Sequence, residues 1–255
     1  MMNLNSQADI ARSLRRLRFV PRLKRSLRKR YIRLKHGDDY FITQYFGAKF
    51  LVHWQDVIAR EIALQNFENV QLENFIAACL RIRPELFIDV GANGGLYSCV
   101  LLKGEYVPRS LLFEPDRRNF ALLQANLLIN GLLERADRNE VALGDAPGHL
   151  RFAPGPESNT GLSRFSADPS ATGYEVKVVR LDDVCTLRGA PIALKIDIEG
   201  FELQALNGMV RVLDENQGVA QIETTTMREE VIRFMRARGF EQSVDLYTDL
   251  VFEKP

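Results

Sequence analysis

Short apolar runs and segments of helical spacing alternate from residue 85 to the end of the chain. Five runs have the length and composition of buried strands, namely residues 87–92, 110–115, 139–144, 192–200 and 218–225. Helical spacing follows most of them, at residues 96–103, 117–130, 201–206 and 228–238. Strands that alternate with helices pair in parallel and are covered on both faces. The pattern therefore predicts an α/β fold with a doubly wound, mostly parallel sheet.

Three further segments complete this prediction. Residues 240–247 and 249–254 predict a terminal antiparallel pair, which brings the sheet to seven strands with an antiparallel last strand. Residues 175–184 alternate in the manner of an edge strand. Residues 145–174 contain scattered Gly, Pro, Ser and Asn. A stretch of this length inside a compact domain is usually a functional loop, and we expect one here.

The N-terminal third of the chain has a different pattern. Residues 39–54 are rich in aromatic and β-branched residues around Gly47 and predict a β-hairpin. Helical spacing follows as far as Arg83, and Pro84 ends it. The expected organisation is a basic N-terminal arm over residues 1–35, a small cap of hairpin and helices over 36–84, and the main domain over 85–255.

The arm is strongly basic, whereas the rest of the chain is acidic. Residues 1–35 hold 12 Lys or Arg and one acid, Asp9, and the remaining residues carry a net charge of about −10. Apolar residues recur at helical spacing along the arm, at Ile10, Leu14 and Leu17 and then at Leu23, Leu27, Tyr31 and Leu34. A basic amphipathic helix is typical of contact with an anionic membrane surface or a nucleic acid. A solvated arm, or one packed on the body, is the alternative.

Composition narrows the class of protein. The 255 residues are 46% hydrophobic and 26% charged, as in ordinary globular proteins. No run of 18 apolar residues and no apolar signal segment is found, so we expect neither a transmembrane helix nor a secretory signal. Three scattered cysteines fit core positions in a reducing compartment, and the three histidines lack zinc-ligand spacing. The expected location is the cytoplasm, with the arm on the inner face of the cytoplasmic membrane.

Carboxylates dominate the ends of the predicted strands. Ligands of open α/β sheets bind beyond the carboxyl ends of the strands, where the strand order reverses. The acids at or just past those ends are, in chain order, Asp89, Glu114, Asp145, Asp197, Glu199 and Glu223. Such a charge does not suit a ligand made only of phosphates. It suits a ligand with cationic and hydroxyl groups.

The glycine turn after the first strand separates two classes of nucleotide ligand. A dinucleotide site has the pattern G-x-G-x-x-G, in which the second glycine lets the backbone approach a pyrophosphate. Here the turn starts at Gly91 but has Asn93 and Leu96 at the second and third glycine positions. Glu114 follows Gly91 by 23 residues, where an acid accepts hydrogen bonds from a ribose diol. A nucleoside with a sulfonium amino acid and no pyrophosphate, S-adenosylmethionine, fits this pattern.

Several segments, in this order along the chain, resemble the FkbM family of S-adenosylmethionine-dependent methyltransferases. They are DVGANGGLYS at 89–98, FEPDRRNFALLQANLLING at 113–131, VALGD at 141–145, RLDDV at 180–184 and LKIDIEGFELQALNGM at 194–209. The resemblance spans about residues 85–225. It implies a class I methyltransferase (Rossmann-like) fold. It also implies, usually, O-methylation of sugars, glycolipids or polyketide-type products.

The resemblance also implies roles for single residues. Cofactor binding falls to Asp89, Gly91, Asn93 and Gly94 for the methionine part, to Glu114 for the ribose and to Asp145 near the adenine. Asp197 and Glu199 are the acids of the KIDIEG segment, where methyl donor and acceptor should meet. Gly95 departs from the family pattern, which more often has a larger apolar residue there.

A sugar hydroxyl needs a general base or a metal to lose its proton, because its pKa lies far above 7. Asp197 is the first candidate for the base, with Lys195 and Glu199 supporting it. On a regular strand these three residues share one face. A structural Lys–Asp ion pair is the alternative, and a divalent cation at this edge is a lesser one, so no metal is expected. Candidates for contact with the acceptor are Glu223, Asn159 and His149.

The function that these observations favour is an S-adenosylmethionine-dependent O-methyltransferase. Its acceptor would be a hydroxyl of a saccharide, a glycolipid or a related secondary metabolite. An RNA or other nucleic-acid methyltransferase, with the arm on phosphates, is the alternative. Against it, residues 197–200 read D-I-E-G instead of the N/D-P-P-Y/F/W run of base amino methylation. A non-catalytic cofactor-binding module is a third possibility, which the strand-end acids disfavour.

Overall fold

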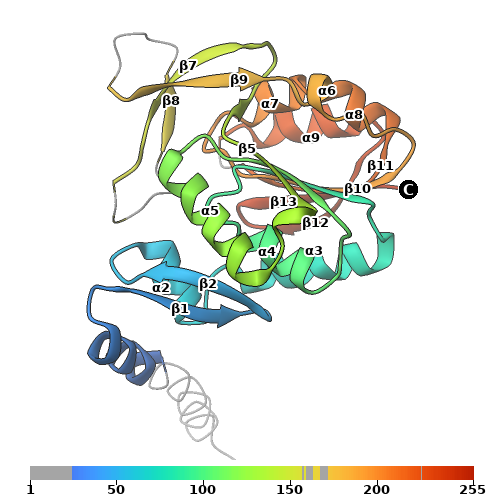
Figure 1. Cartoon of the computed structure of the whole chain (residues 1–255). Helices are drawn as coiled ribbons and strands as arrows, with labels where there is room; N and C mark the ends of the chain where they lie inside the picture. The colour runs from blue at the N-terminus through green and yellow to red at the C-terminus, as the bar shows by residue number, and fades with distance from the viewer. Residues whose placement is uncertain (1–24, 157, 159–162, 167–171, 225) are drawn as a thin grey trace, which may run out of the picture.

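A computed structural model of the chain describes residues 25–156, 158, 163–166, 172–224 and 226–255. Its main sheet has seven strands in the order β12-β13-β11-β10-β3-β4-β5 (Figure 1). In that order the strands are Glu241–Leu246, Asp249–Lys254, Gln217–Glu223, Pro191–Ile196, Leu86–Val90, Ser110–Phe113 and Ala136–Asn139. Only β13 runs antiparallel to its neighbours, β11 and β12. The mostly parallel sheet with an antiparallel last strand is therefore confirmed.

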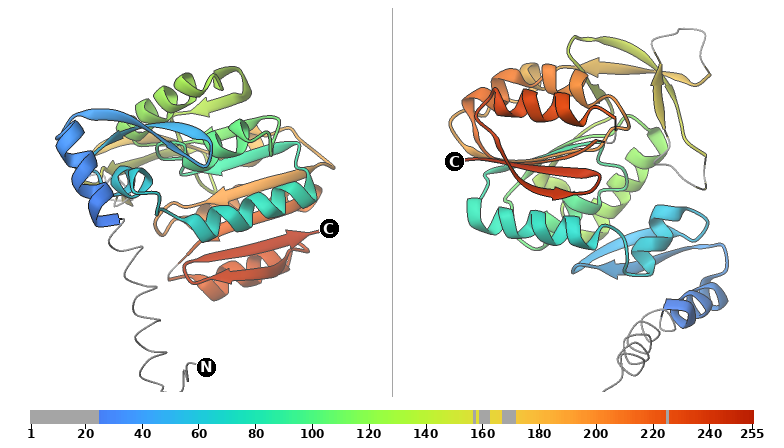
Figure 2. Two further views of the ribbon diagram at one scale, coloured as in Figure 1. Left: turned by 90° about the horizontal axis from the view of Figure 1, so that it is seen from below. Right: turned by 180° about the vertical axis from the view of Figure 1, so that it is seen from behind.

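Helices cover both faces of this sheet (Figures 1 and 2). On one face lie α3 (Asn69–Ile82), α4 (Leu96–Lys103) and α5 (Arg117–Asn130), and on the other lie α6 (Leu181–Val184), α7 (Glu202–Asn207), α8 (Val210–Glu215) and α9 (Arg228–Arg236). Successive strand residues point to opposite faces, so β3 gives Phe87 to the first core and Ile88 to the second. By the same alternation, Asp89 and Lys195 belong to the face of α3 and α4.

The helices next to the glycine turn begin and end where the sequence predicts. Asp116 starts α5, because its side chain accepts the backbone N–H groups of Arg118 and Asn119. Gly131 ends it at φ 71°, a left-handed conformation that glycine adopts without steric cost. α4 likewise spans the predicted residues 96–103.

The predictions for residues 139–184 were wrong in two respects. The third strand of the main sheet is β5, and the apolar residues after it enter β6 (Ala142–Leu143) of a second sheet. Second, the described part of residues 145–174 is not a plain loop, because it includes β7 (Gly148–Ala153) and β8 (Arg164–Ser166). The strand predicted over residues 175–184 is present as β9 (Tyr174–Val179), but it ends earlier, is followed by α6, and lies inside the second sheet, whose order is β6-β9-β7-β8. β5 is mostly polar, and it forms the edge of the main sheet, where fewer side chains have to be buried.

The cap consists of the predicted hairpin and two helices. β1 (Tyr40–Tyr45) and β2 (Ala48–His53) pair in antiparallel fashion through a turn at Phe46 and Gly47, both at positive φ. α2 (Val57–Ala63) and α3 follow. A further helix spans residues 25–36 and holds to α2 through an ion pair from Arg25 to Glu61 at 2.6 Å. Residues 1–24, with most of the arm, lie outside the described residues.

Two buried amides join the cap to the main domain. Asn126 of α5 accepts the backbone N–H of Leu51 at 2.8 Å and donates to the carbonyl of Gly94 at 2.7 Å. Asn130 exchanges the same kind of hydrogen bonds with the backbone of Lys49. The outer edge of β2 is thus satisfied by side chains, and one of them also holds the glycine turn.

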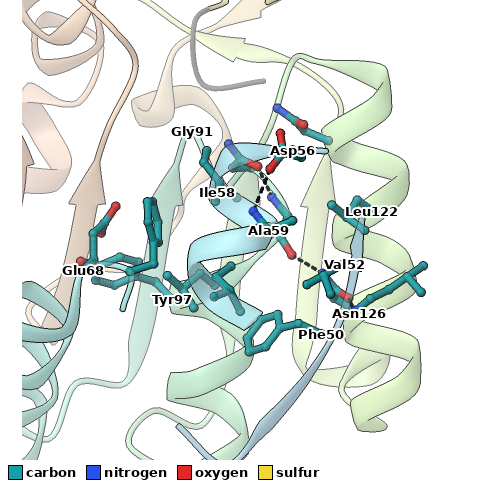
Figure 3. A pocket seen from close by; sticks show the side chains of 18 of the residues that line it. Phe50, Val52, Asp56, Ile58, Ala59, Glu68, Gly91, Tyr97, Leu122 and Asn126 are labelled. Atoms are coloured by element: carbon teal, nitrogen blue, oxygen red, sulfur yellow. Dashed lines mark hydrogen bonds between the residues drawn. The ribbon is translucent and has the colours of Figure 1, made fainter. Parts of the chain in front are cut away.

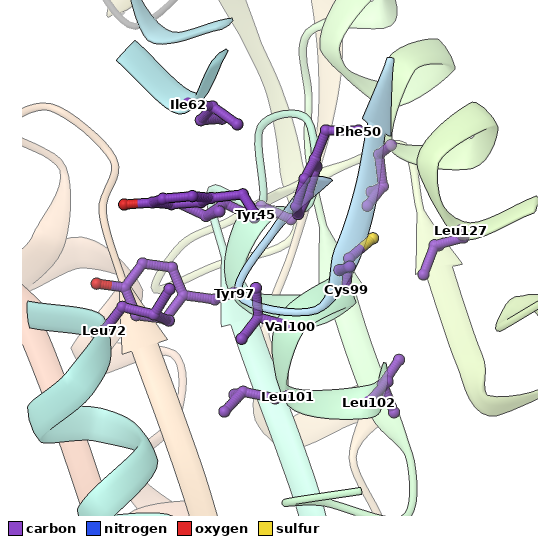
Figure 4. Packing of buried hydrophobic residues seen from close by; sticks show 14 of the residues in the cluster. Tyr45, Phe50, Ile62, Leu72, Tyr97, Cys99, Val100, Leu101, Leu102 and Leu127 are labelled. Atoms are coloured by element: carbon purple, nitrogen blue, oxygen red, sulfur yellow. The ribbon is translucent and has the colours of Figure 1, made fainter. Parts of the chain in front are cut away.

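Apolar packing continues across the same boundary. Figure 4 shows Tyr45, Phe50 and Ile62 of the cap over Tyr97 and Cys99 of α4. All three cysteines are buried and free, which confirms their prediction as small core residues. In the part of the chain that the structure describes, no helix is long and apolar enough to cross a membrane.

Candidate active site

The glycine turn between β3 and α4 uses its own backbone donors. Gly91 and Ala92 both donate to the carbonyl of Phe113, and Gly95 donates to that of Ala92. Two side chains accept the remaining backbone N–H groups. Asn93 N–H donates to Glu114 Oε2, and Gly94 N–H donates to Asn93 Oδ1, each at 2.7 Å. Every N–H from 91 to 95 is therefore engaged. A pyrophosphate, which needs such donors, would have to break this arrangement.

Gly91 is required by a close backbone approach. A Cβ atom there would lie 2.0 Å from the carbonyl oxygen of Asp197 and 2.9 Å from the side chain of Ile198. The φ of Gly91 is also +82°, which a side chain disfavours. The loop after β10 therefore sits directly against the turn after β3. This contact brings Asp197 to the site.

Glu114 lies at the carboxyl end of β4 and holds two loops at once. Its carboxylate accepts the N–H of Asn93 and the N–H of Asp116, both at 2.7 Å. Burial raises the pKa of Glu114 to about 8, although these two hydrogen bonds lower it. Each carboxylate oxygen can accept a further hydrogen bond, which suits a vicinal diol.

A buried polar cluster lies beneath the turn. Lys195 is almost fully buried, and its Nζ lies 3.2 Å from Asp197 and 3.8 Å from Asp249. The ammonium also stands 5.0 Å from the centre of the Tyr97 ring. Gln221 joins the cluster by donating to Asp249 and to the hydroxyl of Tyr97. The members come from β10, β11, β13 and α4, which all face the cap side of the sheet.

Acids outnumber bases around this cluster. Asp89 accepts a hydrogen bond from Ser98, and burial raises its pKa to about 6. Burial and the charge of Asp197 raise the pKa of Glu223 to about 8. Lys195 is the counter-ion that these groups share, and nearby carboxylates raise its pKa against the effect of burial. The site thus favours an additional positive charge.

Two adjoining cavities open beside the turn, of about 290 Å³ and about 320 Å³. Both are bounded by Gly91, Asn93, Asp197 and, from the cap, Ile58 and Glu68. The first extends under the hairpin between apolar side chains, among them Phe50, Val52 and Leu122 (Figure 3). The second extends over Glu114 toward Glu199 and Glu223. The cap therefore forms the roof of both.

The second sheet supplies aromatic walls that the sequence pattern did not reveal. Phe152 of β7 and Phe165 of β8 both line the cavity over Glu114, with ring centres 5.1 Å apart. Pro115 and Ile198 add further apolar surface there. A flat base attached to a ribose at Glu114 can pack against these side chains. Their position depends on strand pairing across residues 148–179.

The structure brings together most of the predicted site residues. Asp89, Gly91, Asn93, Gly94, Lys195 and Asp197 line the first cavity, and Glu114, Glu199 and Glu223 line the second. The shared face expected for the three charged residues of the KIDIEG segment extends only to Lys195 and Asp197. β10 ends at Ile196, and Glu199 is exposed with φ 51°, so strand alternation does not reach it.

Two predicted residues lie elsewhere, and the structure does not describe a third. Asp145 follows β6, is exposed and lines neither cavity. His149 lies on β7 with a side chain 60% exposed and its ring nitrogen 3.6 Å from Glu175. Its surface pocket is separate from both cavities. Asn159 lies outside the described residues. No described contact therefore supports the roles predicted for these three residues.

Besides these aromatic walls, the sequence did not predict Glu68 and Tyr97 as residues of the site. Glu68 stands just before α3 in the cap, and Tyr97 is in the first turn of α4. The only signal for Glu68 was an acid next to an aromatic residue at a helix start, which is common on surfaces. Tyr97 read as one of several apolar residues of a buried helix.

This architecture defines the class of the protein. The strand order places an antiparallel strand between two parallel ones at one edge. A glycine turn follows β3, and a buried acid, Glu114, follows β4. These are the features of a class I methyltransferase. A family model described as the methyltransferase FkbM domain matches residues 89–241, and the chain belongs to this family of S-adenosylmethionine-dependent methyltransferases.

The chain is similar to several known methyltransferases. The hexuronic acid methyltransferase AglP of Haloferax volcanii is 28% identical over 131 residues, 49% of this chain and 50% of that protein. The methyltransferase sdnD of Sordaria araneosa is 27% identical over 194 residues, 62% of this chain and 74% of that protein. A crystal structure of methyltransferase FkbM from Methylobacillus flagellatus is 20% identical, with a TM-score of 0.48, over 77% of this chain and 52% of that one. The chain thus spans about half the length of the first and third.

The donor set of the site fits S-adenosylmethionine. Glu114 offers carboxylate oxygens to hydroxyl groups, and the acids around Lys195 favour cations such as an ammonium or a sulfonium. The engaged donors of the turn disfavour a diphosphate. Among the described residues, no group of three or more His, Cys, Asp and Glu side chains is arranged to hold a metal ion.

Proposed function

We propose that the protein methylates a hydroxyl group of a saccharide, a glycolipid or a related secondary metabolite. The observation that carries this proposal is Asp197, a carboxylate at the boundary of both cavities, beside the turn that would hold the methyl donor. A carboxylate at this place can accept the proton of an alcohol. The relationship to a protein named as a hexuronic acid methyltransferase supports a sugar-like acceptor.

When bound, S-adenosylmethionine supplies a methyl group already activated on a sulfonium. Asp197 would accept the proton that the acceptor hydroxyl releases when its oxygen is methylated. Lys195 orients Asp197 through their 3.2 Å contact. The cap covers this region. It would limit the entry of water and help to hold the acceptor in place.

Replacing Asp197 with asparagine is expected to lower methyl transfer about 100-fold or more while S-adenosylmethionine still binds. The amide keeps the shape of the side chain but cannot accept the proton. The measurement compares the glycans and glycolipids of cells that lack the protein, complemented with wild type or with the variant, by mass spectrometry. Wild type should restore glycans that are heavier by one methylene group, and Asp197→Asn should not.

The exposed acid Asp183 provides a matched control, because it lies on α6 outside both cavities. Asp183→Asn should restore the methylated glycans fully. Restoration by Asp197→Asn to the wild-type level would exclude Asp197 as the base. The absence of any methylated glycan, glycolipid or secondary metabolite that depends on wild type would refute the acceptor class.

We also propose that an anionic membrane surface is the partner of the arm. In the helix over residues 25–36, Ile32 is buried against the body, whereas Leu27, Tyr31 and Leu34 are 59%, 62% and 79% exposed. Their spacing places the three on one face of the helix. Exposed bases flank them, namely Arg25, Arg28, Lys29, Arg30, Arg33 and Lys35. This combination suits an interface of anionic headgroups and acyl chains.

Replacing Leu27, Tyr31 and Leu34 together with serine is expected to lower binding to phosphatidylglycerol vesicles about 10-fold or more. The reason is the loss of apolar area that would enter the bilayer. Vesicle flotation measures the effect, with uncharged phosphatidylcholine vesicles as the lipid control. Leu128→Ser is the protein control, since Leu128 is equally exposed but lies on α5 away from the helix.

Equal flotation of wild type and the triple variant would contradict this partner. If wild type bound a single-stranded RNA, lost this binding at higher salt and did not bind vesicles, the partner would be a nucleic acid instead.

A further inference from the structure

Glu68 is an acid of the cap that the chemistry described above does not use. It lies in the left-handed region at φ 49° and precedes the first residue of α3. Such a backbone conformation is uncommon for a residue with a side chain and indicates a constraint on its position. Its side chain bounds both cavities, and Figure 3 shows it among the residues that line the first.

One carboxylate oxygen of Glu68 has no partner within the described structure. Its Oε2 atom is fully buried and accepts no hydrogen bond from a described residue. A buried acceptor without a donor is costly, so such atoms usually meet a ligand or a water molecule. The atom stands at the cavity boundary that includes Gly91 and Asn93, the turn expected to hold the methionine part of the cofactor.

The charges that face Glu68 do not neutralise it. Lys195 is the nearest base, and it is already paired with Asp197 and Asp249. Glu223 also faces this space, and the hydroxyl of Tyr97 donates a hydrogen bond to the Glu68 carboxylate, which leaves Oε2 as the oxygen without a partner. One buried ammonium therefore serves several acids. Burial raises the pKa of Glu68 to about 7 and that of Glu223 to about 8, so a further cation between the cap and the turn would favour their ionised forms.

We propose that Glu68 binds the cationic methionine part of S-adenosylmethionine from the cap side, opposite the glycine turn. The orphaned oxygen then accepts a hydrogen bond from the ammonium or lies against the sulfonium, and the cation stabilises the ionised form of Glu68. The cap thereby becomes part of the cofactor site as well as its roof. This inference rests on the cofactor of the family and is independent of the acceptor.

The proposal has a consequence for protons. Burial and Asp197 raise the pKa of Glu68 to about 7, although Lys195 lowers it. In the free protein, Glu68 is therefore partly protonated near neutral pH. A cation at the carboxylate lowers this pKa, so binding releases a proton. The release is largest between the bound and free pKa values and vanishes at high pH, where Glu68 is already ionised.

Calorimetric titration of the full chain with S-adenosylmethionine tests the proposal. Titrations at pH 6.5 in two buffers of different ionisation enthalpy give the number of protons released along with the dissociation constant. For Glu68→Gln, we expect a dissociation constant about 10-fold higher or more, because a charge-assisted hydrogen bond is lost. We also expect fewer protons to be released than by wild type.

Titration with S-adenosylhomocysteine assigns the cation, since this product keeps the ammonium but has no sulfonium. Weakened binding of both molecules places the ammonium at Glu68, and weakened binding of S-adenosylmethionine alone places the sulfonium there. Glu73→Gln is the matched control, as Glu73 lies on α3 with an exposed side chain. It should bind both molecules as wild type does.

Glu68→Asp keeps the charge but shortens the side chain, and it serves if the glutamine variant does not fold. It should bind S-adenosylmethionine more weakly than wild type. Unchanged affinity and unchanged proton release in a folded Glu68 variant would overturn the proposal. That result differs from failure of the proposed function, in which wild type binds the cofactor and methylates no hydroxyl.

Discussion

Glu114→Gln is expected to weaken S-adenosylmethionine binding about 100-fold or more. The carboxylate holds Asn93 and Asp116 through two backbone hydrogen bonds and still offers acceptors to a ribose diol. An amide presents N–H groups on one side, where they oppose a backbone N–H, and it leaves fewer acceptor positions for the ribose diol. Calorimetric titration with the cofactor measures the loss.

The same substitution has an effect on stability that depends on pH. Burial raises the pKa of Glu114 from its ordinary 4.5 to about 8, so folding takes up a proton between these values. Wild type therefore loses stability as the pH rises through this window, whereas glutamine does not titrate. Relative to the variant, the free energy of unfolding of wild type should fall by up to about 1.4 kcal/mol per pH unit. Urea unfolding at pH 5, 6.5 and 8 checks the slope.

A nearby exposed acid separates this effect from a general loss of charge. Glu140 follows β5, is exposed and forms a 3.6 Å ion pair with Arg117. Glu140→Gln should change neither cofactor affinity nor the pH dependence of unfolding, because a solvated pair contributes little. If Glu114→Gln bound the cofactor as tightly as wild type, Glu114 would not be the ribose ligand.

Lys195→Met is expected to lower the free energy of unfolding by about 3–5 kcal/mol at pH 8. Asp249 is nearly fully buried, and Asp197 is partly buried, and both lose their counter-ion. Unfolding by urea at pH 8 measures the loss.

A second substitution identifies the cause of that loss. Lys195→Met with Asp249→Asn should recover part of the stability, since one uncompensated charge is removed with the ammonium. Lys177→Met, at an exposed position of β9, should be nearly neutral. If the double variant loses at least as much free energy of unfolding as the two single variants together, the loss arises from packing of the lysine stem instead.

Local signals were sufficient for the elements beside the glycine turn. α4 and α5 have the predicted bounds because strong local features determine them, such as the capping side chain of Asp116 and the left-handed Gly131. The same holds for the hairpin turn at Gly47. Alternation along β10 correctly placed Lys195 and Asp197 together, but it failed at Glu199, where the strand had already ended.

The segment from 139 to 184 could not be assigned in this way. β6 is only two residues long, and it joins the second sheet through pairing with β9, which lies more than thirty residues further along the chain. Apolar residues such as Val141 and Ala142 fit either sheet by composition. The choice depends on long-range pairing, which a local pattern does not encode. The aromatic walls at Phe152 and Phe165 follow from that pairing.

The sequence by itself determined the alternation of strands and helices, the acids at the strand ends and the turn that disfavours a pyrophosphate, because these depend on short-range spacing. Only the tertiary structure decided that Glu68 of the cap faces Lys195 and that Gly91 meets the carbonyl of Asp197. Those contacts join residues more than a hundred positions apart. They exist because the cap packs on α4 and α5 and because two parallel strands end side by side.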